Sequence, residues 1–373
     1  MVSIPLSNFK EAVDGSFDYI LITDPDGIIL YANSAIERIT GFTPQEVIGK
    51  KAGTKDLWGG LMGKPFYERL WKILKQDKKP FTGEVKNKRK DGTLYDAFHT
   101  ITPVLDKDGN VQFFFEIQRD ITHDKEVDRA KTEFVSLASH QLRTPLTAIN
   151  WYSEMLLSGD VGAVSEEQSH YLKEIYKGSQ RMVRLVNDLL NVSRLEAGGL
   201  IVEPVPTKIS SLISASIKEG KFIEAEREIP VRFKNSKEDI KLAVDSELLS
   251  QVLRNIINNA VRYCSGLPNP QVEVSLDKRA VEGVNSLVIK VEDNGIGIPK
   301  VEQHRVFEKF FRASNAQKAA PGGTGLGLYI SKTVVEKWGG KMWFESGERK
   351  GTIFYVTIPL TGMVFQKGEK KLA

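Results

Sequence analysis

The chain has 373 residues, of which 41% are hydrophobic and 27% are charged, as is typical of a folded globular protein. At roughly 150 residues per domain, this length predicts two or three domains, each large enough to bury a core. The net charge of +4 arises from 52 basic and 48 acidic residues, so the balance gives no reason to expect a nucleic-acid partner.

A single cysteine, Cys264, excludes an internal disulfide, a zinc ribbon and haem attachment through paired cysteines. This usage suits a reducing cytosol. No stretch approaches the ~20 apolar residues that span a bilayer, and the first residues, MVSIPLSNFKEAV, lack the basic start and long apolar core of a signal peptide. We therefore expect a cytoplasmic chain without a membrane segment, while a membrane part further upstream stays open.

The first hundred or so residues alternate short strand patterns with turns. Residues 18–33, DYILITDPDGIILYAN, contain two β patterns around a PDG turn. Helical segments follow, and strands return over residues 81–122 with DG turns at 91–92 and 108–109. The basic run KNKRK at residues 86–90 lies in a predicted hairpin turn, which favours a solvent-exposed loop over a nucleic-acid site.

The order of these motifs resembles a PAS domain. The matching segments are ITDPDGIILYANSA, ITGFTPQEVIGK, the two DG turns and a closing RDIT at residues 119–122. The resemblance implies an α/β sensor domain over residues 1–122. No reactive cysteine of the light-sensing flavin subclass and no haem-ligating histidine in residues 65–76 is present, so the ligand is unknown. Four aromatic residues are candidates for a ligand cavity or, as the favoured alternative, for plain core: Phe66, Tyr67, Trp71 and Phe81.

A helical pattern follows residue 122. Apolar residues from Val127 to Leu137 recur three, four and three apart, which predicts a continuous coiled-coil-like helix to about residue 157. Ser165 and Gln168 form a capping box that opens a second helix, which runs to about residue 196. Two helices cannot bury such apolar stripes alone, so we predict that residues 123–200 form a homodimeric four-helix bundle.

The third region, residues 201–361, has α/β character after a linker containing Pro204 and Pro206. Strongly patterned helices are predicted at residues 246–263, capped by Asp245, and at 326–337. A mixed sheet with one covered face is predicted from strands at residues 231–234, 240–244, 271–276, 286–292, 341–345 and 352–358. Residues 362–373 form a predicted polar tail, whose end, KGEKKLA, is expected to be disordered.

The helix at residues 246–263 carries two asparagines, Asn255 and Asn259, stacked one turn apart. Asparagine is a mediocre helix former, and its amide oxygen is a suitable ligand for Mg2+ that bridges ATP phosphates. Two asparagines on a solvated face are the alternative. DNGIGI at residues 293–298 follows a predicted strand and places a carboxylate beside glycines that let a ligand approach the backbone. GGTGLG at 322–327 opens a predicted helix, where backbone N–H groups face a phosphate.

The set of the asparagine helix, DNGIGI, FEKFFR at residues 307–312, GGTGLGL and GTIF at 351–354 resembles the nucleotide-binding boxes of histidine kinases. This resemblance implies an α/β sandwich of the Bergerat type that binds ATP and Mg2+. It assigns Mg2+ to Asn259 with Asn255 assisting, and the adenine amino group to Asp293. Further nucleotide-binding candidates are Arg262, Tyr263, Gly295, Gly297, Lys309, Arg312, Gly323, Thr324, Gly325, Leu326 and Gly327, and the resemblance places Gly323, Gly325 and Gly327 in a mobile lid. Related ATPases carry a glutamate at the position of Asn255, and an amide cannot activate water, which favours transfer over hydrolysis.

His140 is the candidate phosphoryl acceptor. It stands in HQLRTPL at residues 140–146, which resembles the phosphoacceptor box of the same family. Imidazole is nucleophilic at cytosolic pH, and Pro145 should bend the helix just after His140 and splay its side chain outward. The other histidines, His99, His123, His170 and His304, lack such context and are interpreted as structural or surface residues.

Two neighbours of His140 bear on its chemistry. The family usually has an acid after the histidine, whereas Gln141 can orient the imidazole but cannot take its proton. Thr144 matches the position that in this family positions water for dephosphorylation of the partner. The sequence therefore predicts a multidomain α+β sensor histidine kinase that phosphorylates His140 and then an aspartate on a separate response regulator receiver domain, with phosphatase activity as a further hypothesis. A nucleotide-binding scaffold and an ATPase are the rivals, and phosphorylation within or between subunits stays undecided.

Overall fold

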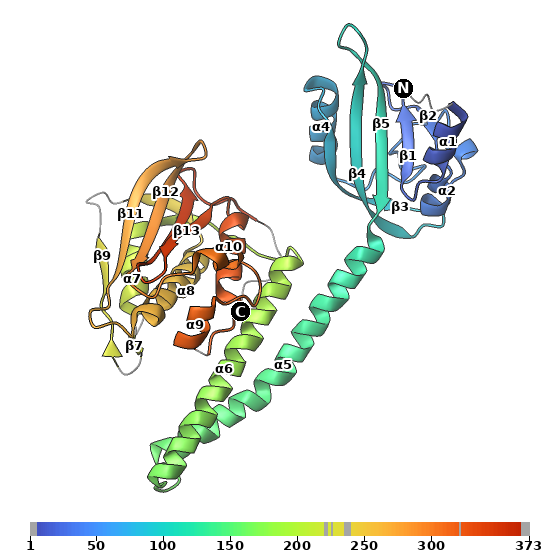
Figure 1. The fold of residues 1–373 in the computed structure, drawn as a ribbon. Helices are drawn as coiled ribbons and strands as arrows, with labels where there is room; N and C mark the ends of the chain where they lie inside the picture. The colour runs from blue at the N-terminus through green and yellow to red at the C-terminus, as the bar shows by residue number, and fades with distance from the viewer. Residues whose placement is uncertain (1–5, 220–222, 225–226, 235–239, 321, 367–373) are drawn as a thin grey trace. The chain divides into compact units, whose positions relative to one another are not determined.

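The computed structural model describes residues 6–219, 223–224, 227–234, 240–320 and 322–366. The chain divides into two compact units, Met1–Ala130 and Lys131–Ala373, here called the N-terminal and the C-terminal unit. Figure 1 shows the elements of each unit. Among the described residues, no helix combines the length and the apolar character that crossing a membrane requires.

The N-terminal unit is built on a five-stranded sheet in the order β2-β1-β5-β4-β3, with antiparallel pairing throughout. The DG turns predicted at residues 91–92 and 108–109 join β3 to β4 and β4 to β5, which confirms both hairpins. The strands are β1 (Tyr19–Thr23), β2 (Ile29–Ala32), β3 (Phe81–Lys88), β4 (Leu94–Leu105) and β5 (Val111–Asp120).

Short helices complete this unit. They are α1 (Leu6–Asp14), α2 (Ala35–Thr40), α3 (Pro44–Val47) and α4 (Lys64–Trp71), and a π-helical turn, η1 (Lys72–Gln76), extends α4. Thr43 begins α3 with a capping box, in which its side chain accepts from the backbone of Glu46. The core lies between the inner face of the sheet and these helices, with Tyr19, Trp58 and Tyr95 as its largest fully buried side chains.

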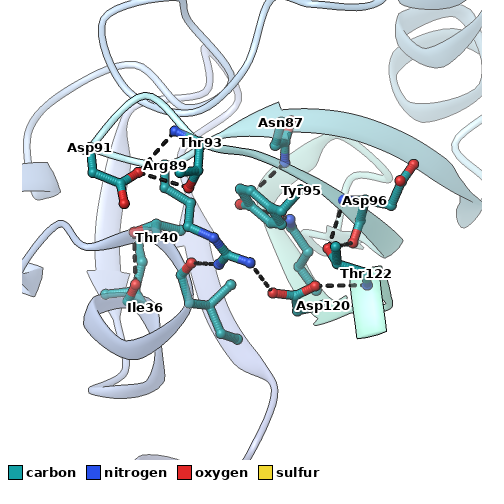
Figure 2. A network of polar contacts seen from close by, with 12 residues as sticks. Ile36, Thr40, Asn87, Arg89, Asp91, Thr93, Tyr95, Asp96, Asp120 and Thr122 are labelled. Atoms are coloured by element: carbon teal, nitrogen blue, oxygen red, sulfur yellow. Dashed lines mark hydrogen bonds and ion pairs between the residues drawn. The ribbon is translucent and has the colours of Figure 1, made fainter. Parts of the chain in front are cut away.

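The basic run at residues 86–90 is not the solvent-exposed loop that the sequence suggests. Lys86, Asn87 and Lys88 end β3, and Asn87 is buried. Figure 2 shows the Arg89 guanidinium paired with Asp120. The two side chains are 2.6 Å apart, and Arg89 also donates to the carbonyl oxygen of Ile39. It also lies 4.5 Å from the ring centroid of Tyr95. Arg89 is therefore part of the folded unit, because an acid, a carbonyl and an aromatic ring surround it.

Two long helices, α5 (Thr122–Ser158) and α6 (Glu166–Glu196), form an antiparallel hairpin (Figure 1). The Ser165 and Gln168 capping box that opens α6 confirms the prediction from sequence. The helix α5 is continuous through Pro145. Side chains join the two helices, since Arg143 donates to Asn187 at 2.6 Å and the Ser179 hydroxyl donates to the carbonyl of Leu146.

The rest of the C-terminal unit contains a five-stranded sheet in the order β13-β14-β12-β11-β9. The pairing of β9 with β11 is parallel and the other pairs are antiparallel, which confirms a mixed sheet. The strand predicted at residues 240–244 is not part of it, because it pairs with residues 205–208 instead. Its strands are β9 (Val231–Lys234), β11 (Val272–Val281), β12 (Val284–Asp293), β13 (Met342–Gly347) and β14 (Gly351–Pro359). Two smaller pairs are β6 (Val205–Lys208) with β10 (Lys241–Val244), and β7 (Ile223–Glu224) with β8 (Arg227–Glu228).

The predicted linker at Pro206 is in fact part of a strand. Pro206 lies in β6 opposite Ala243 of β10. Because this sheet has only two strands, the N–H group that proline lacks can be missing at an edge without breaking a ladder. The linker prediction was wrong here because a strand with a proline has no clear local pattern.

The helices of this region are α7 (Ile209–Glu219), α8 (Ser246–Cys264), α9 (Ser314–Ala319) and α10 (Gly327–Lys337), with a 3-10 turn, η2 (Lys300–Arg305). Asp245 caps α8 as predicted, since its side chain accepts from the backbone of Leu248. The core continues into the end of α6 through Val192 and Leu195, so the hairpin and the sheet share one apolar core. Met363 is also buried, while residues 367–373 of the predicted tail lie outside the described residues.

Candidate nucleotide-binding site and phosphoacceptor helix

A pocket of about 280 Å3 in the C-terminal unit gathers most of the candidate residues. Its wall is formed by α8, the end of β12 and the loops before α9 and α10. The predicted residues on this wall are Asn255, Asn259, Arg262, Tyr263, Asp293, Gly297, Arg312, Gly323, Thr324, Gly325 and Gly327. The other three predicted nucleotide-binding residues, Gly295, Lys309 and Leu326, are not part of it.

The two asparagines of α8 differ in their surroundings. The Asn255 amide nitrogen donates to the hydroxyl of Ser331 on α10 at 2.8 Å, and Ser331 is only 2% exposed. Asn255 thereby ties α8 to α10 at the edge of the pocket. Asn259, one turn further along α8, lines the same pocket. The one-turn spacing thus places both amides on one side of the pocket, as predicted from the sequence.

Asp293 ends β12 and is 7% exposed. Its Oδ1 accepts from the backbone N–H of Gly295 at 2.8 Å and of Thr352 at 3.3 Å. Burial raises the pKa of this carboxyl to about 6, although the two backbone N–H groups act in the opposite direction. Asp293 is therefore a buried acceptor group whose charge the surrounding protein only partly stabilises.

The glycines after Asp293 are required by close contacts of the backbone. A Cβ at position 295 would lie 2.6 Å from the carbonyl oxygen of Tyr263 and 2.7 Å from Asp293 Oδ1. Gly297 has a φ of +64°, and a Cβ there would overlap the carbonyl oxygen of Gly347. Gly295 thus supports the pocket from behind through its bond to Asp293, rather than lining it.

The loop before α10 contacts the helical hairpin. The Thr324 hydroxyl donates to Asp188 Oδ2 on α6 at 2.7 Å, and it also accepts from the backbone N–H of Leu326. Asp188 and Arg184 line the pocket, although sequence reasoning did not find them. Burial raises the pKa of Asp188, while its bond with Thr324 lowers it. Leu326 is fully buried in the core, so its place is structural.

Two cationic candidates lie in different places. Arg312 lines the pocket and donates to the carbonyl oxygen of Ala316 at 2.9 Å. Lys309 instead pairs with Glu196 at the end of α6, and this bond raises the pKa of Lys309. Glu196 is also 3.5 Å from the ammonium of Lys131. The structure therefore places Lys309 at a contact between α6 and the loop before α9, outside the pocket wall.

The candidate phosphoacceptor lies on α5 of the same unit. His140, Gln141 and Thr144 are exposed, while Ser139 and Leu146 on the neighbouring face are buried. The Thr144 hydroxyl is 3.5 Å from the carbonyl oxygen of His140. The proline at 145 leaves the Gln141 carbonyl without its usual helical donor. The His140 imidazole is thus accessible to solvent, while the side of α5 that contains Arg143 and Leu146 is bonded to α6.

Known protein families match three parts of the chain. Residues 18–123 match the PAS domain, residues 130–198 match the His Kinase A (phospho-acceptor) domain, and residues 244–362 match the histidine kinase-, DNA gyrase B-, and HSP90-like ATPases. The sensor protein kinase WalK of Staphylococcus aureus is 31% identical over 359 residues, which is 92% of this chain and 78% of that sequence. The chain belongs to the sensor histidine kinase family.

Other relatives are longer. WalK of Staphylococcus saprophyticus subsp. saprophyticus is 31% identical over 357 residues, which is 92% of this chain and 53% of the relative. The chain thus spans about half the length of several curated relatives that it matches. The crystal structure of full-length ShkA in complex with AMPPNP has a TM-score of 0.50 at 23% identity, covering 63% of this chain and 47% of ShkA, and it supports the fold alone.

Proposed function

We propose that this chain binds ATP in the C-terminal pocket, transfers the γ-phosphoryl group to His140, and passes it to an aspartate on the receiver domain of a separate response regulator. The observation that carries the proposal is that one pocket gathers Asn259, Asp293 and the glycine-rich loop at residues 322–327. The exposed His140 belongs to the same compact unit. The family to which the chain belongs supports this assignment.

The pocket residues fit the parts of ATP. In the ionised form, Asp293 is an acceptor for the exocyclic amino group of adenine, and its buried position excludes competing water. The loop before α10 offers backbone N–H groups at the start of a helix, where an anion is stabilised. Arg184, Arg262 and Arg312 are cations on the wall that can neutralise phosphate charge. The loop that includes Gly323, Gly325 and Gly327 then serves as a lid over the phosphates.

The donor set also fits Mg2+. No group of three or more histidine, cysteine or acidic side chains suitable for a metal occurs among the described residues. In a nucleotide site Mg2+ is held mostly by phosphate oxygens and water, and Asn259 would supply the protein ligand. When bound, Mg2+ neutralises the charge that develops on the phosphates during transfer. Asn255, fixed by Ser331, holds α10 and α8 together at this point.

Hydrolysis of ATP is disfavoured by the same arrangement. Asn255 is an amide, so it cannot accept a proton from a water molecule. Its amide N–H group already donates to the hydroxyl of Ser331. The imidazole of His140 is a better nucleophile than unactivated water, and the loose transition state of phosphoryl transfer depends more on position than on a strong base. Asn255 therefore favours His140 as the acceptor.

The neighbours of His140 support a second activity on the partner. Gln141 cannot act as a base, which should slow phosphorylation of His140. Thr144 is exposed one turn further along α5 and can orient a water toward a phosphorylated partner. We propose that the chain also dephosphorylates its response regulator. Measured rates of His140 phosphorylation and of regulator dephosphorylation test this, and Thr144→Ala should reduce only the second; equal loss of both would contradict it.

We further propose that the helical hairpin forms a homodimer. Phe134 is 71% exposed and Leu137 is 63% exposed, and one hairpin alone leaves such side chains in water. Other exposed apolar side chains on α5 and α6 are Leu142, Ile149, Tyr171, Ile175, Met182, Leu185 and Leu189. A second copy can cover them as a four-helix bundle.

Sedimentation analysis tests the dimer. Ile175→Glu should raise the dissociation constant at least ~100-fold because a charge would be buried in the interface. Lys173→Glu changes an exposed neighbouring residue and serves as the control, with little expected effect. A parent chain that sediments as a monomer at micromolar concentration would contradict the proposal.

Incubation with γ-labelled ATP and Mg2+ tests the proposed activity. Protein label that is lost in acid and stable in alkali, and that is absent in His140→Ala, supports the kinase. Free phosphate without protein label would instead support an ATPase. Nucleotide binding without either product would support a scaffold that uses the nucleotide as a conformational ligand.

A further inference from the structure

The wall of the C-terminal pocket includes residues of the helical hairpin as well as residues of the sheet region. Its charged side chains are Arg184, Asp188, Arg262, Asp293 and Arg312. Arg262 and Asp293 come from α8 and β12, and Arg312 follows η2, whereas Arg184 and Asp188 come from α6. Because Arg184 and Asp188 are four residues apart on a helix, they lie on the same side of α6. One side of α6 therefore forms part of the pocket wall.

The loop before α10, residues 322–326, is held against this side of α6. The Thr324 hydroxyl donates to Asp188 Oδ2 at 2.7 Å. A Cβ at Gly322 would lie 3.6 Å from Nε of Arg181, which is also on α6. The loop leads into the start of α10, where backbone N–H groups stabilise an anion. Helix α6 thus contacts the same loop that offers these N–H groups to a phosphate.

The guanidinium of Arg184 is available to a ligand. It is exposed and has no hydrogen-bonded or ion-paired partner within the described part of the chain. Burial raises the pKa of Asp188, while the bond with Thr324 and the nearby charge of Arg184 act in the opposite direction. Asp188 alone would repel a phosphate, but the Thr324 hydroxyl and Arg184 both offset its charge. Arg312, by contrast, already donates to the carbonyl oxygen of Ala316.

The same stretch of α6 is joined to the turn of α5 that contains His140. Arg143, three residues after His140, donates to Asn187 at 2.6 Å. Asn187 directly precedes Asp188, so neighbouring residues of α6 contact the acceptor helix and the pocket. In the proposed reaction the terminal phosphate must approach the hairpin, since it is the group transferred to His140. A cation that α6 contributes to the wall is therefore placed for the γ-phosphate.

We propose that Arg184 is a phosphate-binding residue that the helical hairpin supplies to the nucleotide site, so that the site is complete only while the loop before α10 rests on α6. The inference rests on the proposed function, because it assumes that ATP binds in this pocket. A guanidinium can donate two parallel N–H groups to phosphate oxygens, which gives strong binding. ADP lacks the γ-phosphate, so it should hold the loop on α6 less strongly than ATP does. Arg184 thereby couples the state of the nucleotide to the contact between the hairpin and this loop.

Calorimetric titration of the full chain in the presence of Mg2+ tests the proposal. The probes are ADP and adenylyl imidodiphosphate, an ATP analogue that resists transfer of its γ-phosphoryl group. Arg184→Ala should weaken binding of the analogue about five- to thirtyfold, and binding of ADP less than threefold. Arg184→Lys keeps the charge but loses the paired donors, and it should give an intermediate loss for the analogue. Lys177→Ala removes an exposed cation two turns away on α6, and it should change neither affinity more than twofold.

Hydrogen exchange of residues 322–326 tests the coupling. In the parent chain the saturating analogue should slow exchange there at least ~3-fold more than saturating ADP does, and in Arg184→Ala both nucleotides should slow it equally. Equal losses of affinity for both nucleotides, an Arg184→Ala chain that binds the analogue like the parent, or equal slowing by both nucleotides in the parent would each overturn the proposal. A parent chain that binds neither nucleotide would contradict the proposed function, and this inference with it.

Discussion

The pocket of the C-terminal unit and the cavity between the sheet and α4 of the N-terminal unit each have a buried carboxylate in the wall. The groups that surround these two carboxylates differ. Around Asp293, backbone N–H groups hold the carboxylate, and glycines bring the chain into close contact. Around Glu116, the contacts are side chains on strands and on α4, and the acid faces the imidazole of His99.

This difference determines which substitutions the pocket and the cavity each tolerate. A wall made of backbone depends on residues that allow a particular main-chain path, so its chemistry is hard to alter by one substitution. A wall made of side chains keeps its shape while single residues alter what it recognises. We expect single substitutions to alter the ligand specificity of the N-terminal cavity more easily than that of the nucleotide pocket.

Replacement of a glycine should give the largest effect. In Gly297→Ala the new Cβ overlaps the Gly347 carbonyl and the backbone has positive φ, so we expect a loss of about 3 kcal/mol or more in unfolding free energy. Gly49→Ala is the control in the N-terminal unit, with a similar φ but open space around it, and should cost about 1–2 kcal/mol. Denaturant unfolding, monitored in each unit by hydrogen exchange, measures the loss of unfolding free energy in both variants. Equal losses would contradict the difference that we infer between the two units.

Removal of a side-chain anchor in the N-terminal unit should have a smaller effect. Arg89→Ala loses its bonds to Asp120 and to the Ile39 carbonyl and its contact with Tyr95, and should destabilise this unit by roughly 1–3 kcal/mol. Hydrogen exchange of the strands β3 to β5 reports the loss. Lys107→Ala, at an exposed turn, should change it by less than about 0.5 kcal/mol.

The charge of Asp293 should oppose folding but support binding. Its folded pKa of about 6 exceeds the unfolded value, so the neutral acid is favoured and the cost of ionisation appears as the pH rises from about 4 to 6. Asp293→Asn should therefore gain stability relative to the parent over that range, by on the order of 1–3 kcal/mol at pH 7. The same variant should lose most ATP affinity. A stability difference that does not depend on pH would contradict this account.

The smallest expected effect concerns the contact between α6 and the loop before α10. Thr324→Val removes the donor to Asp188, which should speed hydrogen exchange at residues 322–326 about fivefold, as expected for the loss of ~1 kcal/mol. Thr333→Val removes a hydroxyl that bonds only within α10 and serves as the control. Unchanged exchange in Thr324→Val would show that this contact does not hold the loop.

Local signals were readable in the sequence, whereas contacts between distant elements were not. The start of α6 at its capping box and the Asp245 cap of α8 depend on residues three apart, and both are confirmed. The pocket wall contributed by Asp188 depends on how α6 packs against the loop before α10, which has no local pattern. The same reason explains Lys309, whose motif suggests a phosphate partner but whose side chain reaches Glu196.

The strand patterns in the sequence predict only part of the N-terminal cavity. Alternation along β5 indicates that Glu116 faces inward, but the sequence alone does not show that β4 places His99 beside it. His99 therefore has no role in an interpretation from motifs, although its Nε2 is one of the few buried polar atoms without a partner among the described residues.

The most direct test of the central claim is to map the phosphorylated residue after the parent chain is incubated with ATP and Mg2+. The account predicts phosphate on the peptide that contains His140, with none in His140→Ala and at least ~100-fold slower labelling in Asn259→Ala. Phosphate on another residue, or labelling of Asn259→Ala at the rate of the parent, would contradict the assignment of the C-terminal pocket as the donor site for His140.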